Sequence, residues 1–238
     1  MREIELCGVR IDNITMEAAV KSALERTGEV NVVFTPNALM LEKCKRDAGL
    51  ASLLSHATLS LPDGAGVLMA ARRMGQPLCE RVAGIDFARA LLSQAAKRNL
   101  RVFLLGGGEG VAAAAAKRLR EELPTLRIVG THWGYFDRRG EENRRLLSMI
   151  REMRVDILLV CMGFPVQEEW VVENLSSLSQ SGTVACLGGS LDVLSGRIKR
   201  APRALSRMGL EWAWRMAREP RRMKDIGKLC RFAVRRKF

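Results

Sequence analysis

The sequence has few of the residues that bind metals or form disulfides. It contains two histidines, and its six cysteines are scattered without a C-x-x-C pair. This spacing argues against a disulfide framework and against a zinc ribbon, and a reducing compartment fits it best. No Asp-x-Asp pair is present that could hold a divalent ion together with a diphosphate. We therefore expect no metal and no other cofactor.

Long apolar runs are missing as well. The longest, at 157–166, has about half of the roughly 20 residues that cross a bilayer, and we interpret it as a core strand. The first six residues include acids where a signal peptide would be apolar, so we expect no export signal and a cytoplasmic protein. The sequence also lacks a Gly-x-Ser-x-Gly elbow, which leaves hydrolysis by a serine nucleophile unsupported.

The net charge of +13 is concentrated at the C-terminal end. Residues 196–238 contain 15 Lys or Arg and 3 Asp or Glu, and the rest of the chain holds 24 basic and 23 acidic residues. An excess of charge confined to one segment indicates an anionic partner there. We therefore predict two parts, a core at 1–195 and a basic appendage at 196–238.

Before residue 195, short β-branched runs alternate with segments of helical period. The runs predict strands at 30–34, 57–61, 101–105, 127–130, 156–161 and 183–187. The periodic segments predict helices at 15–25, 38–46, 66–73, 85–98, 110–122, 141–153 and 167–178. This alternation predicts an α/β fold with a mainly parallel sheet and flanking helices. Residues 4–11, with Gly8 in the middle, predict a small N-terminal β-hairpin.

In the appendage, apolar residues recur at spacings of three and four on both sides of Pro220. This pattern predicts two basic amphipathic helices separated by the proline. Such helices can lie on an anionic membrane surface, with Trp212, Trp214 and Phe232 at headgroup depth and arginines facing phosphates. The alternative is that they pack on the core, which would bury part of a dense arginine excess at a cost. We therefore expect an anionic membrane surface as a partner.

The stretch "GGGEG", residues 106–110, follows an expected strand and opens an expected helix. Its backbone N–H groups could hold a diphosphate at the helix N-terminus, or its glycines could simply form a tight turn. It is a poor dinucleotide fingerprint, because Val111 takes the place of the third glycine and no acid ends the next strand. A dinucleotide-dependent oxidoreductase is therefore a distant alternative.

In "LSLPDGAG", residues 59–66, a carboxylate stands between a proline and a glycine at the end of an expected strand. Pro-Asp-Gly is typical of turns, so Asp63 can be a turn residue and no more. Alternatively, the strand brings Asp63 to the mouth of an α/β sheet, where such folds bind ligands. Polar residues at other expected strand ends are Thr35, Asn37, Arg81 and Gln167. Together they are placed like a ring around one sheet edge.

Nine blocks of sequence, in order, give the chain a family resemblance. They are "TPNALMLEKCKRD", "LPDGAGV", "ERVAGIDF", "FLLGGGEGVAAAAA", "IVGTHWGYF", "MGFPVQEEW", "LGGSLDVLSG", "RAPRAL" and "GLEWAWRMAREPRR". Over residues 35–222 the chain resembles the WecG/TagA/CpsF family of bacterial glycosyltransferases, glycosyltransferase family 26. These enzymes build cell-surface polymers by adding a sugar from a nucleotide diphosphate donor to a polyprenyl-diphosphate-linked sugar.

The resemblance implies an inverting, metal-independent enzyme with a Rossmann-like core and a C-terminal appendage that meets the membrane. It implies that Asp63 is the general base that deprotonates the acceptor hydroxyl. The residues it implies for the donor and acceptor pocket are Thr35, Asn37, Arg81 and Gln167. Those implied for the nucleotide are Gly106, Gly107, Gly108, Tyr135 and Asp192. Arg215 and Arg222 would close over the leaving diphosphate.

We thus expect transfer of an N-acetylmannosamine-like hexose from a UDP-sugar to undecaprenyl-diphosphate-linked N-acetylglucosamine. The enzyme would act at the cytoplasmic face of the bacterial inner membrane, as a monomer or small homo-oligomer. The main alternative is a nucleic-acid-binding module that uses the arginine-rich tail. It accounts for the charge but not for the apolar stripe, which suits a lipid interface better. We therefore expect no nucleic-acid partner.

Overall fold

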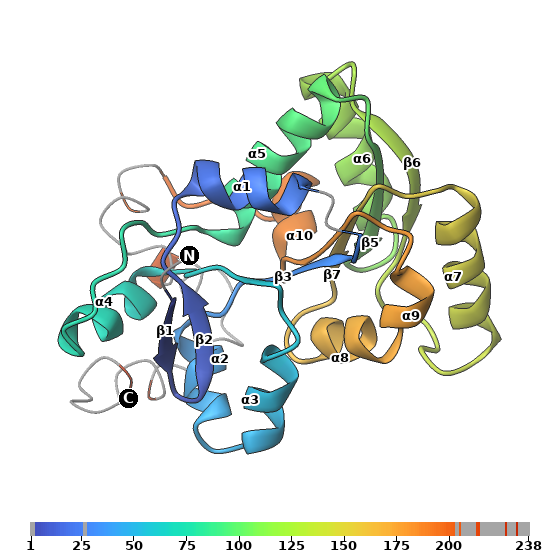
Figure 1. Cartoon of the computed structure of the whole chain (residues 1–238). Helices are drawn as coiled ribbons and strands as arrows, with labels where there is room; N and C mark the ends of the chain where they lie inside the picture. Colours follow the sequence, from blue (N-terminus) through green and yellow to red (C-terminus); the bar gives the residue numbers. More distant parts are fainter. Residues whose placement is uncertain are drawn as a thin grey trace.

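The computed structural model describes residues 3–25 and 28–202, together with Leu205, Ala213, Trp214, Gly227 and Phe232. In these residues six parallel strands form one sheet with the spatial order β4-β3-β8-β7-β5-β6 (Figure 1). Their bounds are β3 (Asn31–Phe34), β4 (Leu59–Ser60), β5 (Arg101–Gly106), β6 (Arg127–His132), β7 (Ile157–Cys161) and β8 (Thr183–Cys186). An antiparallel hairpin, β1 (Glu3–Leu6) and β2 (Val9–Asp12), forms a second small sheet. The predicted parallel sheet and N-terminal hairpin are confirmed.

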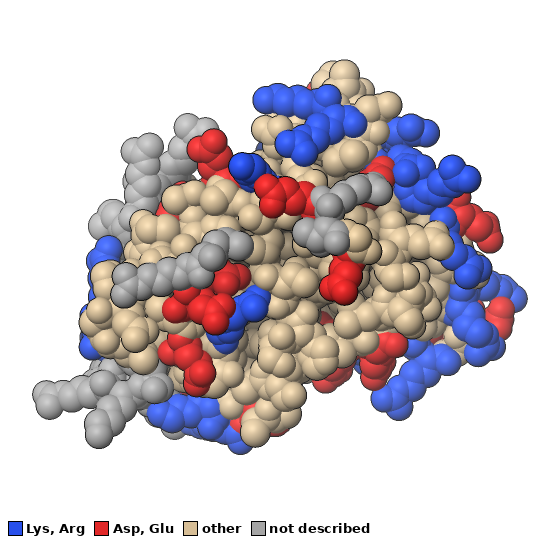
Figure 2. All heavy atoms as spheres, viewed as in Figure 1, with Lys and Arg blue, Asp and Glu red and all other residues tan. Residues whose placement is uncertain are grey.

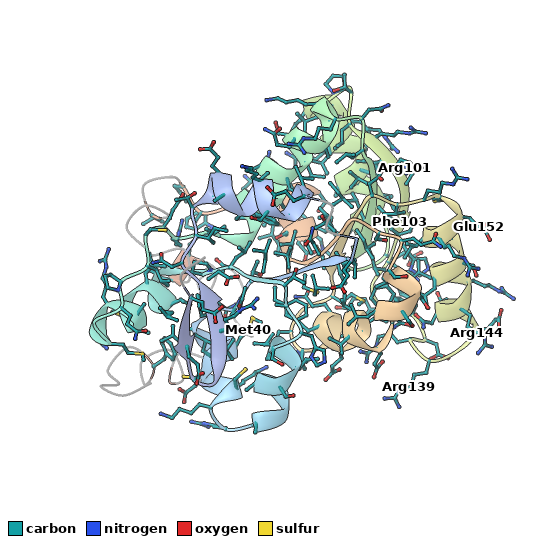
Figure 3. All side chains as sticks on the ribbon, viewed as in Figure 1. Met40, Arg101, Phe103, Arg139, Arg144 and Glu152 are labelled. Atoms are coloured by element: carbon teal, nitrogen blue, oxygen red, sulfur yellow. The ribbon has the colours of Figure 1, made fainter. Side chains whose placement is uncertain are left out.

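The central strands are buried on both faces, as expected for a parallel sheet covered by helices. All five residues of β7 are buried, and successive side chains alternate between two apolar clusters. Leu158 and Val160 face one cluster, whereas Leu159 and Cys161 face the other. This explains why the sequence here is one continuous apolar run. Phe103 on β5 faces the same cluster as Leu158 (Figure 3).

Helices cover both faces of the sheet (Figure 1). One face is covered by α1 (Met16–Leu24), α5 (Gly84–Lys97), α6 (Val111–Glu122) and α10 (Ser190–Leu194). The other face is covered by the hairpin and by α2 (Ala38–Cys44), α3 (Ala48–Leu54), α4 (Ala65–Arg73), α7 (Glu141–Glu152), α8 (Val166–Glu173) and α9 (Leu175–Leu178). Because every strand runs in the same direction, the six strand-to-helix loops meet at one edge of the sheet.

Three helical details differ from the prediction. The helix expected at 38–46 ends at Cys44, and α3 begins behind Asp47, whose carboxylate caps it by accepting from the amides of Gly49 and Leu50. The helix expected at 167–178 is divided at Asn174, whose side-chain amide donates to the carbonyl of Trp170 over 2.7 Å. The short helix α10 was not predicted, because its five residues hold too little periodic pattern.

The chain leaves the core through a fixed junction. Arg200 forms two hydrogen bonds of 2.6 Å with the carboxylate of Asp86, in the first turn of α5. Trp214 is half-buried, and its indole N–H donates to the carbonyl of Lys199 over 3.2 Å. The predicted appendage helices lie mostly outside the described residues, and the predicted division at residue 195 stays a prediction. Among the residues that are described, no helix is both long and apolar enough to cross a membrane.

Phe232 corrects one expectation about the tail. Its side chain is 1% exposed and belongs to the apolar cluster that covers one face of the sheet. A Cβ added to Gly66, on α4, would lie 3.8 Å from its ring. The prediction that Phe232 lies at lipid headgroup depth is therefore wrong, because burial in the core removes more apolar surface from water than a membrane interface would. At this residue the tail packs on the core.

Figure 2 shows Lys and Arg side chains gathered along the edge formed by α7 and β6. Arg139 and Arg144 point outward there (Figure 3). Both meet acids, since Arg144 pairs with Glu141 and Arg139 lies 3.9 Å from Glu173. These exposed pairs contribute little to stability, and we assign them no role in substrate binding.

Candidate active site

Backbone hydrogen bonds join three loops at the carboxyl ends of β3 and β4. The amide of Asp63 donates to the carbonyl of Pro36 over 3.1 Å, and the amide of Val82 donates to the carbonyl of Pro62 over 3.0 Å. The loop after β3, the Pro-Asp-Gly loop and the loop between α4 and α5, which carries Arg81, therefore lie side by side. The prediction that Arg81 stands at a strand end is wrong, because its loop follows a helix. The predicted neighbours Thr35, Asp63 and Arg81 are brought to one end of the sheet edge.

The Pro-Asp-Gly segment forms a turn and places the carboxylate of Asp63 after the end of β4. Gly64 has a φ of 94°, a value that side chains with a Cβ disfavour, and it caps the N-terminus of α4. Gly66 lies so close to α2 that an added Cβ would be 2.9 Å from the Cβ of Ala38. The two glycines thus hold α4 tightly against α2, and Asp63 stands half-buried just before this contact.

Thr35 and Asn37 fix the loop after β3. The buried hydroxyl of Thr35 donates to the carbonyl of Cys186, at the end of β8, over 3.1 Å. Asn37 caps α2, because its side-chain oxygen accepts from the amides of Leu39 and Met40. Its side-chain NH₂ lies 3.4 Å from the sulfur of Met40. Both residues therefore hold the backbone of the site in place.

Gln167 is more deeply embedded than a surface ligand would be. It is 2% exposed, and its side-chain oxygen accepts from the amides of Gly163, after β7, and Gly188, after β8. Its NH₂ group donates to the carboxyl of Glu168 over 2.8 Å. The Gln167 amide thus ties two neighbouring loops of the sheet edge together.

The glycine-rich loop lies at the carboxyl end of β5. A Cβ on Gly106 would collide with the carbonyl oxygen of Cys161, so only glycine fits. Gly107 donates to that same carbonyl over 3.0 Å and accepts from the amide of Gly134 over 2.9 Å. The loop is therefore braced by the ends of β7 and β6.

Beyond this brace, the loop offers free donors. Within the described residues, the amides of Gly108, Glu109 and Gly110 donate to no protein acceptor. They precede the 12-residue helix α6, whose N-terminus carries a partial positive charge. Such an arrangement suits an anion, and the diphosphate cradle stays a prediction.

Tyr135 and Asp192 flank this loop. Tyr135 follows Gly134 and is 75% exposed, and its ring centroid lies 6.4 Å from that of Trp133. Asp192 stands in the first turn of α10. Burial raises the pKa of the Cys161 thiol to about 12, and the charge of Asp192 contributes to this increase, which places Asp192 near the end of β7.

The site therefore has two ends. Asp63 follows β4, and the glycine-rich loop follows β5, four strands away in the sheet. With a spacing of roughly 4.8 Å per strand, these two strands lie about 19 Å apart. Arg215 and Arg222, predicted to close over the diphosphate, lie outside the described residues. Within the described part of the chain, no group of three or more His, Cys, Asp or Glu side chains could hold a metal ion.

Comparison with known proteins names the family. The sequence profile of the Glycosyl transferase WecG/TagA/CpsF family matches residues 4–236. The chain belongs to this family. The resemblance predicted from the nine blocks is confirmed, and the enzyme is a glycosyltransferase.

The family includes curated relatives with one shared name, N-acetylglucosaminyldiphosphoundecaprenol N-acetyl-beta-D-mannosaminyltransferase. A protein of Bacillus spizizenii is 36% identical over 180 residues, which cover 74% of this chain and 68% of the relative. One of Staphylococcus aureus strain MW2 is 31% identical, covering 95% and 88%, respectively. One of Bacillus subtilis strain 168 is 32% identical, covering 85% and 77%. The predicted class, a hexosyltransferase, agrees with these names.

Two residues of this WecG/TagA/CpsF member were missed by sequence reasoning. Arg197 is exposed, and its guanidinium Nη1 lies 3.2 Å from the position of a Cβ on Gly108. The two residues are far apart in sequence, so only the fold brings them together. Glu168 is fully buried, and burial raises the pKa of its carboxyl to about 7. Its place beside Gln167 in "MGFPVQEEW" was the available signal.

Proposed function

We propose that this enzyme transfers an N-acetylmannosamine-like hexose from a UDP-sugar to a polyprenyl-diphosphate-linked N-acetylglucosamine. The names of the relatives support the acceptor and the hexose. The donor nucleotide is what the family resemblance implies, and the distance between the two ends of the site is compatible with it. A sugar with a diphosphate and a nucleoside attached is an extended molecule, which can place its anomeric carbon and the adjoining phosphate near Asp63 while its nucleoside end extends toward the glycine-rich loop.

The observation that carries this proposal is the position of Asp63. Its loop is hydrogen-bonded to the loop that carries Thr35 and, through Pro62, to the loop that carries Arg81. A single carboxylate in this position can act as a general base, whereas a retaining mechanism would require a nucleophile and an acid/base group close together. We propose that the reaction proceeds with inversion.

In the proposed step, the Asp63 carboxylate takes the proton from the acceptor hydroxyl. The hydroxyl oxygen forms a bond to the anomeric carbon, and the bond between that carbon and the diphosphate oxygen breaks. The electron pair leaves with UDP, whose negative charge needs stabilisation in the transition state. We propose Arg215 and Arg222 for this stabilisation, with the guanidinium of Arg197 and the amides of Gly108 to Gly110 as further candidates on the nucleotide side of the diphosphate. We therefore propose that no metal is needed.

The basic appendage would bring this chemistry to the lipid-linked acceptor. We propose that arginines of 196–238 bind the anionic inner leaflet, since each basic residue near such a surface contributes about 1 kcal/mol. Phe232 takes no part in this contact, because it is buried in the core. The protein would then act at the cytoplasmic face of the membrane.

A product assay tests the proposed function. The full chain would be incubated with a panel of UDP-sugars and a short-chain lipid diphosphate that carries N-acetylglucosamine. Mass spectrometry should show one added N-acetylhexosamine with the N-acetylmannosamine donor, and proton NMR should show an anomeric configuration opposite to that of the donor. Absence of any product from the whole panel would contradict the proposed function, and retained configuration would contradict inversion.

A further inference from the structure

Glu168 is a buried acid that the reaction described above does not use. Its side chain is 0% exposed, and within the described part of the chain its Oε2 atom has no hydrogen-bond partner. A buried carboxyl with an unpartnered oxygen is costly, and native structures contain few such groups. Its presence at the edge of the active site therefore needs an explanation.

Three elements meet around this carboxyl. Glu168 lies on α8. The titratable groups that interact electrostatically with its carboxyl are Lys43 and Cys44 on α2, Cys186 on β8 and Glu169 on α8. Burial is the main cause of its raised pKa, and the hydrogen bond from Gln167 and, more weakly, the charge of Lys43 oppose that increase. The ammonium of Lys43 lies 5.3 Å from the ring centroid of Phe164, in the loop after β7. Glu168 is thus buried between the loop-bearing ends of two strands and α2.

The neighbouring Gln167 has its orientation fixed from both sides. A side-chain amide can be turned by 180°, which exchanges its oxygen and its nitrogen. Two backbone N–H groups, of Gly163 and Gly188, face one end of this amide and require the oxygen there. Glu168 Oε1 faces the other end and accepts from the nitrogen. The acceptor on Glu168 therefore favours the orientation in which Gln167 joins the two loops.

We propose that Glu168 is a positioning residue for the transfer reaction, acting through Gln167. Its carboxyl oxygen holds the Gln167 amide so that the loops after β7 and β8 keep the spacing that the bound sugar requires. These loops lie between the Asp63 end and the glycine-rich end of the site, where the reacting part of the donor would lie. The proposal rests on the proposed function for its catalytic consequence, but its structural consequence can be measured separately.

Two variants test separately whether the hydrogen-bond acceptor or the negative charge of Glu168 is required. Glu168→Gln removes the charge and keeps an oxygen within reach of Gln167, whereas Glu168→Asp keeps the charge and withdraws the oxygen by one methylene. If Glu168 acts by position, Glu168→Gln should retain kcat within about threefold, and Glu168→Asp should lose 10- to 100-fold, since small misplacements of bound substrate are costly. The KM for the UDP-sugar should change less than kcat in Glu168→Asp, because the glycine-rich end is untouched.

Amide hydrogen exchange of Gly163 and Gly188, followed by NMR, gives a readout that does not depend on activity. Both amides should exchange faster in Glu168→Asp and at the wild-type rate in Glu168→Gln. Equal exchange in all three proteins, or an active Glu168→Asp beside an inactive Glu168→Gln, would overturn the proposal. If the wild type transfers no sugar at all, the proposed function fails, and the exchange data still decide whether Glu168 positions Gln167.

Discussion

The amide of Asp63 donates to the carbonyl of Pro36, and this one hydrogen bond joins the loop that carries the predicted base to the loop that carries Thr35 and Asn37. The parallel strands β3 and β4 bring the two loops to the same edge of the sheet, and the bond fixes the position of one loop relative to the other. Thr35 continues the connection to β8 through its bond to Cys186, and Gln167 continues it to β7. The site is thus one connected edge of the sheet.

Asp63→Asn should abolish transfer without unfolding the protein. The change keeps size and the backbone bond to Pro36, but an amide cannot accept the acceptor proton. A general base contributes about 10²- to 10⁴-fold, so kcat should fall by at least 100-fold while donor binding stays nearly unchanged. Glu17→Gln, an exposed change on α1, serves as the control. Retention of more than about a tenth of the wild-type rate would remove Asp63 from this role.

The sequence predicted the sheet because buried parallel strands have a distinctive composition. The strands predicted at 101–105 and 156–161 correspond closely to β5 and β7, and glycine or proline marks the loops that follow. β4 was harder to place, since only Leu59 and Ser60 of the five expected residues form ladder pairs. The order of the strands could not be deduced, because it depends on packing between helices distant in sequence.

The candidate site was predicted in part for the same reason. Polar residues that follow strands within a few positions, such as Asp63 in the loop after β4 and Gln167 in the first turn of α8, could be recognised because all parallel strands end at one edge. Arg197 could not, since its contact with Gly108 depends on where the chain turns after α10. Phe232 was misread because the apolar face of an amphipathic helix looks the same whether it meets a membrane or a protein core.

Chelation should not reduce activity. Within the described residues no cluster of metal ligands is present, and we propose that arginines and backbone amides stabilise the leaving diphosphate. Transfer by the full chain should therefore proceed at the same rate in excess EDTA as in buffer with magnesium. Loss of activity in EDTA that manganese or magnesium restores would contradict this mechanism.

The stability of the protein should depend on Glu168 between about pH 4.5 and pH 7. Its pKa is raised to about 7 by burial, so over this window the folded state holds a proton that the unfolded state has released. The stability that this shift contributes is therefore fully present below the pKa of Glu168 in the unfolded state. It is lost as the pH rises through the folded-state pKa, by at most roughly 3 kcal/mol. Denaturant titrations should show Glu168→Gln gaining stability relative to wild type across this window.

Phe232 should anchor the tail to the core. Replacement of a buried phenylalanine by alanine costs about 3–5 kcal/mol, so Phe232→Ala should lower the free energy of unfolding or release the tail to limited proteolysis. Leu205→Ala, at a half-buried position, should have a smaller effect. A chain cut after Ser195 should aggregate, because the apolar surface around Gly66 becomes exposed. A soluble, monomeric 1–195 fragment with unchanged stability would show that this contact is dispensable.

Arg197 allows a sharp test of the diphosphate cradle, because its position is unfavourable without an anion. A guanidinium near the N-terminus of α6 meets the positive end of the helix dipole, an interaction of about 0.3–1 kcal/mol in the wrong direction. Arg197→Ala should therefore leave the ligand-free protein as stable as the wild type or slightly more stable. With UDP bound, the loss of a charge-assisted bond of about 1.5–3 kcal/mol should weaken binding by at least tenfold. Arg127 begins β6 and so lies at the amino ends of the strands, away from the loops of the site. Arg127→Ala should therefore change neither the stability of the ligand-free protein nor its affinity for UDP. Calorimetry with UDP and thermal unfolding with and without it measure both effects, and unchanged UDP affinity in Arg197→Ala would remove this residue from the cradle.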